Sequence, residues 1–204
     1  MPARPAPPPR PARRSLAQRL RGLAWLALSI AALWWGAGWL WEQPLMERPR
    51  TLWQLTRMLP PAALPVPVDG VAARRIADTW GATRDGGARG HEGVDIFAPR
   101  GTPVRSATLG IVAAIRDGGL GGKQVWVLGP ARERHYYAHL DDWAPGLGVG
   151  DVVRPGALLG FVGDSGNAQG TPPHLHYGIY GGAGAYNPWP LLRAAAADSA
   201  PDRP

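Results

Sequence analysis

The sequence predicts a mainly β domain over residues 70–190, preceded by one N-terminal helix that can cross a membrane. Short apolar runs recur through the domain region with Gly and Pro between them, which is typical of an antiparallel sheet or sandwich. The same region has no long stretch with helical periodicity, which disfavours alternating strands and helices. Residues 22–41 form an uncharged run, and a helix needs about 20 apolar residues to span the hydrocarbon core of a bilayer.

The positive charge of the chain is concentrated at its N-terminus. Residues 1–21 hold six arginines and no acidic residue, which leaves sixteen basic and fifteen acidic residues in the rest of the chain. Because the net charge of +7 is almost entirely this block, we expect no nucleic acid among the partners. The block is also rich in Pro and has little apolar surface to bury, so we expect a cytoplasmic segment without a core. The absence of cysteine excludes disulfides, thiolate metal sites and cysteine nucleophiles.

The uncharged run, GLAWLALSIAALWWGAGWLW, is expected to be a transmembrane anchor. Trp39 and Trp41 lie at its far end, where indole rings favour the boundary with the lipid headgroups. The preceding arginines should stay in the cytoplasm, so the chain would cross the inner membrane once and carry its domain on the periplasmic or wall side. A cleaved signal peptide is the alternative, but its apolar region usually has only about 7–15 residues before an A-x-A-like site. This run is longer, and no good A-x-A site follows it.

The segments that flank the domain have distinct compositions. Residues 42–69 contain six prolines and predict a semi-stiff stalk. Within it, Leu52, Leu55 and Leu59 have helical spacing, so we expect one short helix that lies against the membrane or docks on the domain. Residues 191–204 are expected to be a flexible tail with a short helix at most.

Seven segments of residues 70–187 carry the strand signal. Each is short, Gly and Pro separate them along the chain, and most are rich in β-branched or aromatic residues. They are EGVDIFA, TPVRSA, GIVAAI, KQVWVLG, RHYYAHL, ALLGFVG and LHYGIY. A region of this length suffices for one hydrophobic core.

The five histidines lie within residues 91–176, in pairs that would share one face of an extended strand. The pairs are His91 with Asp95, His135 with His139, and His174 with His176. Imidazole nitrogens and carboxylate oxygens bind zinc at about 2.0–2.2 Å, and a catalytic zinc typically has three protein ligands and a position for water. The residues alone therefore favour a metal site with zinc hydrolysis as the first chemistry, while copper or nickel binding stays open.

Three motifs in a fixed order resemble a known family. HEGVD matches an H-x-G-x-D element, YAHL matches a middle histidine segment, and PHLHY matches an H-x-H element. Together they resemble the LytM-type (M23, lysostaphin-like) zinc metallopeptidases, and the likeness extends over about residues 64–188. This resemblance implies a compact antiparallel β domain with an open groove, and cleavage of peptide cross-links in the stems of bacterial peptidoglycan.

The resemblance also implies a role for each histidine of the motifs. His91, Asp95 and His176 match the zinc ligands of the family, and His139 and His174 match its two assisting catalytic histidines. Bound zinc can lower the pKa of water from about 15.7 to about 7, and a nearby imidazole can act as a general base worth about 10²–10⁴-fold in rate.

Four further features of the domain region lead to separate expectations. Tyr137 would share a face with His139 and bind substrate in the groove, although a packed tyrosine is an equal alternative. His135 has no counterpart in the family, so we expect a solvated strand end. GDSG at residues 163–166 is expected to be a glycine-rich turn and not a serine nucleophile. Gly178 stands where relatives often carry a larger or acidic residue.

Two functions follow from the resemblance. The first is a membrane-anchored zinc endopeptidase that acts on peptidoglycan. The second is a non-catalytic module of the same fold that binds wall or division proteins. Non-enzymatic relatives usually lose zinc ligands, and this chain keeps all of them, which favours the enzyme. The bond remains open, with D-Ala–diaminopimelate favoured over a glycine bridge.

Overall fold

The computed structural model describes residues 15–198. The expectations for residues 1–14 and 199–204 lie outside this range. The described chain divides after Met46 into two compact units, and each unit is described by itself.

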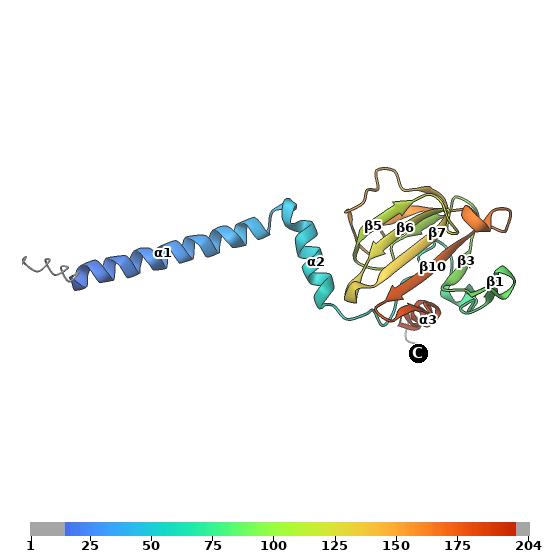
Figure 1. Cartoon of the computed structure of the whole chain (residues 1–204), viewed down its shortest axis with the longest axis horizontal. Helices are drawn as coiled ribbons and strands as arrows, with labels where there is room; N and C mark the ends of the chain where they lie inside the picture. The colour runs from blue at the N-terminus through green and yellow to red at the C-terminus, as the bar shows by residue number, and fades with distance from the viewer. Residues whose placement is uncertain (1–14, 199–204) are drawn as a thin grey trace, which may run out of the picture. The chain divides into compact units, whose positions relative to one another are not determined.

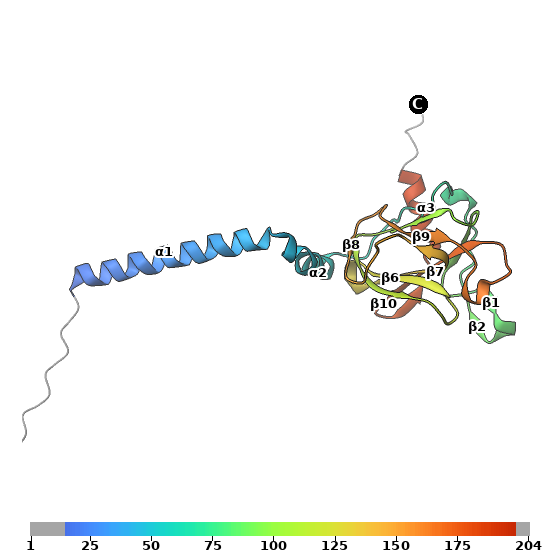
Figure 2. The ribbon, with the colours of Figure 1, turned by 90° about the horizontal axis from the view of Figure 1, so that it is seen from above.

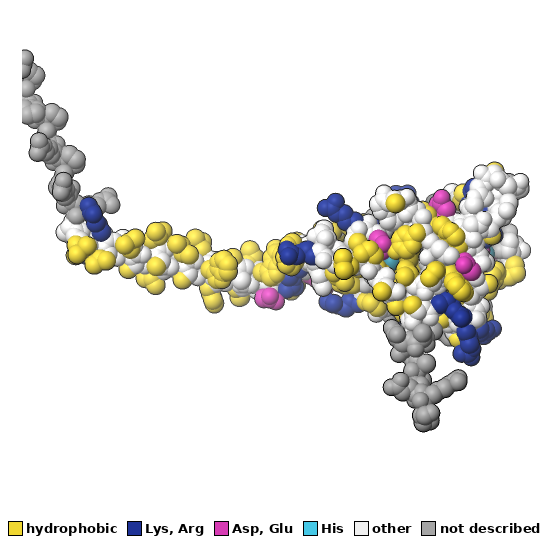
Figure 3. All heavy atoms as spheres, turned by 90° about the horizontal axis from the view of Figure 1, so that it is seen from below, with side chains coloured by type: hydrophobic (Ala, Val, Ile, Leu, Met, Phe, Trp, Pro, Cys, Tyr) yellow, Lys and Arg dark blue, Asp and Glu magenta, His cyan; other side chains and the backbone are white. Residues whose placement is uncertain are grey.

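The first unit is dominated by helix α1, Leu16–Trp41. Ser15 caps its N-terminus through a capping box in which the Ser15 side chain accepts from the Gln18 backbone and the Gln18 side chain accepts from the Ser15 backbone. Because this box sets the start, the helix begins ahead of the uncharged run. None of its residues is buried, and apolar side chains cover it in the space-filling view (Figure 3). By length and composition α1 can cross a membrane, as anchors and signal sequences both can. The short helix η1, Pro44–Met46, follows it.

The second unit begins with helix α2, Glu47–Arg57. This helix docks on the domain: Thr51 and Leu55 are buried, and the helix contacts β5, β8 and η4. The segment expected as a stalk therefore differs from a free linker in this structure. Leu64 and Val68 also belong to the hydrophobic core. The physical reason is that the apolar residues between the prolines pack against the domain and are buried there.

Nine strands of the described chain form one antiparallel sheet, and every segment predicted as a strand contributes to it. The strands are β3 Val94–Phe97, β4 Pro103–Arg105, β5 Gly110–Arg116, β6 Lys123–Leu128, β7 Arg134–Trp143, β8 Val152–Val153, β9 Leu158–Val162, β10 His174–Gly181 and β11 Gly184–Tyr186. The predicted fold class is thus confirmed. Two short strands, β8 and β11, carried too few residues to give a sequence signal.

The smaller elements surround this sheet. They are η2 Ala73–Arg75, β1 Thr83–Arg84, η3 Asp85–Gly87, β2 Arg89–Gly90, η4 Pro130–Arg132, η5 Gly166–Ala168 and α3 Trp189–Asp198. Strands β1 and β2 pair with each other as a hairpin that projects from one end of the domain in two views (Figures 1 and 2). Leu192 of α3 is fully buried, so the segment expected to be a flexible tail begins as a docked helix.

Strand β10 holds the centre of the site. Its first half pairs with β3, its second half pairs with β11, and its other edge pairs with β7. Figure 1 shows β3, β10 and β7 side by side. Alternate residues of β10, Leu175, Tyr177 and Ile179, are fully buried in the core, so His174 and His176 point to the opposite face of the sheet.

An irregularity in β7 decides which of its side chains share that face. Opposite β6, Val125 pairs with Tyr137 but Lys123 pairs with Leu140, so β7 contains one extra residue, which is a β-bulge. His139 adopts a positive φ of 62° at this point. The alternation of β7 is therefore interrupted between Tyr137 and Leu140.

Candidate functional site

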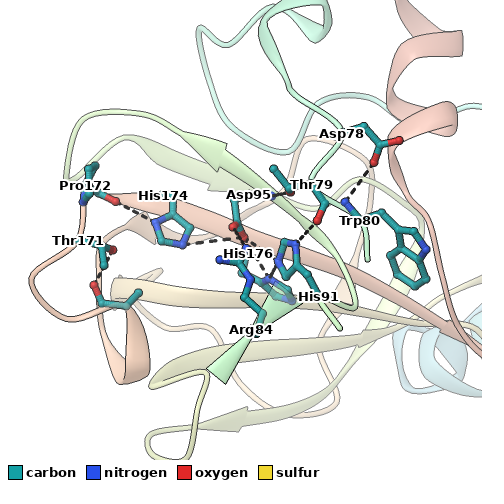
Figure 4. A network of polar contacts seen from close by, with 11 residues as sticks. Asp78, Thr79, Trp80, Arg84, His91, Asp95, Thr171, Pro172, His174 and His176 are labelled. Carbon is teal, nitrogen blue, oxygen red and sulfur yellow. Dashed lines mark hydrogen bonds and ion pairs between the residues drawn. The ribbon is translucent and has the colours of Figure 1, made fainter. Parts of the chain in front are cut away.

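The three residues expected to hold a metal converge on one point. The Nε2 atom of His91 lies 3.0 Å from Oδ1 of Asp95 and 2.8 Å from Nδ1 of His176. Nδ1 of His176 lies 3.2 Å from the same Asp95 oxygen. Figure 4 shows the three side chains pointing toward one another. Two imidazole nitrogens and one carboxylate oxygen at such mutual distances form a donor set suited to zinc.

The convergence depends on a close approach at Gly93. A Cβ atom at this position would lie 2.6 Å from the carbonyl oxygen of Tyr177 and 2.7 Å from Cε1 of His176. Only glycine therefore lets the chain turn from His91 into β3 against the ring of His176. His91 itself precedes β3, so the turn, and not the shared face of a strand, brings it beside Asp95.

Outer contacts orient two of the three donors, His91 and Asp95. Nδ1 of His91 donates to the backbone carbonyl of Thr79 at 2.7 Å, which leaves Nε2 as the metal-facing nitrogen. The Thr79 hydroxyl accepts from the backbone N–H of Asp95 at 3.0 Å. Arg84 of the hairpin pairs with Oδ2 of Asp95, the oxygen that does not face the histidines. Thr79 and Arg84 had no motif of their own, so the sequence did not identify them.

The protonation states of the cluster also suit a cation. Burial raises the pKa of Asp95, but hydrogen bonds from His176 and His91 outweigh burial and hold the pKa well below its ordinary value. Burial lowers the pKa of His176, against the opposing effect of its Asp95 hydrogen bond. An ionised carboxylate beside a neutral imidazole is the state that metal coordination requires.

The two histidines expected to assist catalysis, His139 and His174, flank this cluster. The ring of His139 lies 5.1 Å from the ring of His174 and 5.8 Å from that of His176, centre to centre. Nδ1 of His139 donates to the carbonyl of Ser165 at 2.9 Å, and Nδ1 of His174 donates to the carbonyl of Pro172 at 2.8 Å. Both rings therefore keep Nε2 free to accept a proton or face a ligand, and Nε2 of His174 is 3.9 Å from Asp95 Oδ1.

The electrostatic setting keeps His139 neutral near pH 7. Burial, helped by the charges of His176 and His174, lowers its pKa from 6.5 to about 4 and outweighs the hydrogen bond to Ser165 and the charge of Asp95, which raise it. A neutral imidazole with a free Nε2 has the form of a proton acceptor.

These groups line a groove with a volume of about 560 Å³. Its floor is the metal-binding cluster, and the hairpin residues Arg84 and Arg89 line it beside that cluster. An aromatic wall consists of Trp126, Tyr136 and Tyr180, in which the first two rings stack at 4.2 Å. The groove gives room for an extended peptide beside the histidines.

The expectation that Tyr137 binds substrate in this groove is wrong. Tyr137 is fully buried, and its hydroxyl accepts from the backbone N–H of Ala107 at 2.9 Å. The bulge in β7 is the reason. It puts Tyr136 on the groove face with His139, whereas a regular strand would have put Tyr137 there. A Cβ atom at Gly178 would meet the ring of Tyr180 at 3.2 Å, so this glycine gives the aromatic wall its space.

The expected solvated position of His135 is also wrong. Its side chain is fully buried on the core face, and Nδ1 lies 2.7 Å from the hydroxyl of Tyr177. The GDSG segment behaves as expected for a turn: Gly166 has a positive φ of 70°. The Ser165 hydroxyl is engaged with the backbone of Lys123 and Leu140, away from any nucleophilic role.

A known family matches the part of the chain that contains this site. The model of "Peptidase family M23" matches residues 89–188, which include all five residues of the cluster and its flanking histidines. A similar protein is the "L-Ala--D-Glu endopeptidase" of Bacillus subtilis (strain 168), which is 41% identical over 142 residues, 65% of this chain and 43% of that protein. Lysostaphin of Staphylococcus simulans is 34% identical over 111 residues, 52% of this chain and 22% of that protein. The chain therefore spans less than half the length of these relatives.

Solved structures share the fold. The catalytic domain of lysostaphin from Staphylococcus simulans superposes with a TM-score of 0.51 at 29% identity, covering 58% of this chain and 92% of that domain. Csd3 of Helicobacter pylori superposes with a TM-score of 0.51 at 32% identity, covering 65% of this chain and 34% of that protein.

Proposed function

The chain belongs to peptidase family M23, and we propose that it is a zinc endopeptidase that hydrolyses peptide bonds of bacterial peptidoglycan. The observation that carries this proposal is the convergence of His91, Asp95 and His176 on one point. Two further histidines with free Nε2 atoms flank that point in an open groove. A binding module would need neither the complete donor set nor the two flanking imidazoles.

The residues divide the work of hydrolysis. His91, Asp95 and His176 would hold zinc, which supplies a Lewis acid for the scissile carbonyl and lowers the pKa of water. His139 is neutral at pH 7 because its pKa is about 4, so it can accept a proton at Nε2. His174 faces the same space and, once protonated at Nε2, can donate to the developing oxyanion or to the leaving amine. Hydrogen bonds from both Nδ1 atoms to backbone carbonyls hold the rings in place.

The substrate class follows from the groove and from the relatives. The aromatic wall offers apolar faces to an extended peptide, and the similar proteins include an "L-Ala--D-Glu endopeptidase" and a "Peptidoglycan DD-endopeptidase". We assign peptidoglycan stems as the substrate on this support.

Helix α1 would anchor the enzyme in the inner membrane. The helix is apolar and 26 residues long, with none of them buried, and arginines precede its uncharged part. Positive charge before a span favours a cytoplasmic N-terminus, which would put the domain on the side of the wall.

Digestion of purified peptidoglycan tests the proposed activity. The unit comprising residues 47–204, loaded with Zn²⁺, should release muropeptides that mass spectrometry identifies by the new amine terminus. Addition of a chelator should stop the release. A zinc-loaded, folded unit that leaves peptidoglycan intact would favour the non-catalytic module.

Three histidine variants test the division of roles. His176→Ala should lose zinc and activity together, because it removes one of three protein donors. His139→Ala and His174→Ala should each keep about one zinc per domain and lose on the order of 10²-fold or more in rate. Arg116→Gln, on an exposed end of β5, is the matched control. An empty site in His139→Ala together with a filled site in His176→Ala would reverse the assignment.

A further inference from the structure

The β1–β2 hairpin places two arginines directly opposite each other. Arg84 and Arg89 are cross-strand partners in its register, and both line the groove beside the metal-binding cluster. Like charges at directly opposed strand positions are destabilising. Anions near both guanidinium groups reduce the repulsion between them.

One of these anions is the carboxylate of Asp95. Arg84 pairs with Oδ2 of Asp95, whose other oxygen faces His91 and His176 (Figure 4). The guanidinium of Arg84 therefore lies one carboxylate away from the point where the cluster converges. Its side chain remains 36% exposed and lines the groove, and a guanidinium carries five N–H donors, more than the contact with Asp95 uses.

Arg89 contacts Asn167, which also lines the groove. With the amide of Asn167 in the orientation that satisfies both of its ends, the side-chain oxygen of Asn167 accepts from Arg89 at 3.1 Å and its nitrogen donates to the Leu120 carbonyl at 2.8 Å. Asn167 belongs to η5. This contact holds the positive charge of Arg89 in the groove lining, on the hairpin side of the cluster.

We propose that Arg84 and Arg89 form a subsite for a free carboxylate on the residue next to the scissile bond. Planar guanidinium groups bind carboxylates through paired, charge-assisted hydrogen bonds. Because Arg84 lies beside Asp95, the carboxylate must lie close to the scissile carbonyl. This inference rests on the proposed peptidase function and specifies its substrate.

Two peptidoglycan bonds have this chemistry. In an L-Ala–γ-D-Glu bond, the α-carboxylate of D-Glu is attached to the carbon that bears the scissile nitrogen. In a D-Ala–diaminopimelate cross-link, the free carboxylate of the acceptor centre has the same position. A glycine bridge has no carboxylate there. The subsite therefore selects the first two bonds against the third.

Paired substrates test the subsite. Synthetic peptides with each of the three bonds are compared, and the first two are also made with the flanking carboxylate converted to a carboxamide. The zinc-loaded full chain in detergent should cleave a carboxylate peptide with a kcat/KM at least about 10-fold above its carboxamide twin. Rates on the L-Ala–D-Glu and D-Ala–diaminopimelate peptides tell which source supplies the carboxylate.

The variant Arg89→Gln assigns the preference to the hairpin. It should bring the ratio between carboxylate and carboxamide peptides close to one, while zinc content stays unchanged. Arg116→Gln, outside the groove, should keep the full ratio. Arg84→Gln should also lower the ratio, and its zinc content reports separately on the contact with Asp95.

The outcomes separate this inference from the function on which it rests. Cleavage of the peptides with equal rates for carboxylate and carboxamide would overturn the subsite and leave the peptidase intact. A ratio that survives in Arg89→Gln and in Arg84→Gln would also overturn it. Preferred cleavage of the glycine bridge would do the same. Failure to cleave any peptide with zinc bound would remove both proposals.

Discussion

At the scale of single residues, the site depends on two glycines that leave space for neighbouring rings. Gly93 leaves the space into which the ring of His176 fits, because a Cβ atom there would lie 2.7 Å from Cε1. Gly178 does the same for the ring of Tyr180. The middle glycine of the HEGVD motif is therefore a steric requirement of the metal-binding cluster.

Gly93→Ala should lower both zinc affinity and stability. The added methyl group must displace the His176 ring or the backbone of β10, and overpacking of this kind costs about 1–3 kcal/mol. Zinc titration and denaturant unfolding of the unit from residue 47 measure the two effects. Gly182→Ala is the matched control, because a Cβ atom there meets nothing within 4 Å. Normal zinc affinity in Gly93→Ala would contradict the steric argument.

His135 should make the domain sensitive to acid. Burial lowers its pKa from 6.5 to about 4, so the folded state prefers the neutral ring and the unfolded state binds the proton first. The free energy of unfolding is then unaffected by this group above pH 6.5 and falls as the pH drops from 6.5 towards 4, by up to about 3 kcal/mol. Urea unfolding across this interval, compared between the wild type and His135→Leu, measures the difference. An identical pH slope in both proteins would be incompatible with a buried neutral His135.

At the scale of elements, helix α2 is part of the domain and its two leucines differ in role. Leu55 is 1% exposed and Leu52 is 44% exposed, although both belong to the same apolar spacing in the sequence. Leu55→Ala should cost about 2–5 kcal/mol in the free energy of unfolding, because it leaves a cavity at the docking surface. Leu52→Ala should change it by less than about 0.5 kcal/mol. Chemical unfolding of the two variants of unit 47–204 distinguishes a docked helix from a free stalk, for which both effects would be small.

Strand β7 shows how one element sets the content of the groove. Its bulge at the positive φ of His139 turns that histidine to the face that carries His174 and His176. The same extra residue sends Tyr137 to the core and Tyr136 to the groove. A regular strand would have presented His135, Tyr137 and His139 together.

At the scale of the whole molecule, the charge block before the uncharged run of α1 predicts the orientation of the chain. Six arginines precede the uncharged run and no acidic residue offsets them, so the N-terminus should stay in the cytoplasm. A reporter that is active only after export, fused behind Pro204, should be active. Retention of residues 1–41 in membrane fractions separates an anchor from a cleaved signal. An active cytoplasmic reporter at the same position would refute the orientation.

The sequence by itself determined the parts of this protein that depend on local pattern. Short apolar runs separated by Gly and Pro predicted the seven main strands, and the uncharged run predicted the helix α1. The resemblance of the HEGVD and PHLHY motifs to a known family implied His91, Asp95 and His176 as ligands, and the structure brings these residues together within 4.8 Å. These features could be predicted because each is encoded by residues that are neighbours in the chain.

Only the tertiary structure decided the features that depend on contacts between distant segments. The bulge in β7 arises from its register against β6, so residue spacing could not place Tyr136 or bury Tyr137 and His135. The docking of α2 depends on a surface built by β5, β8 and η4. Arg84 meets Asp95 because a hairpin folds back onto the groove, and no motif encodes that return. A local pattern determines which face of an element is apolar, whereas packing against the rest of the chain determines what that face meets.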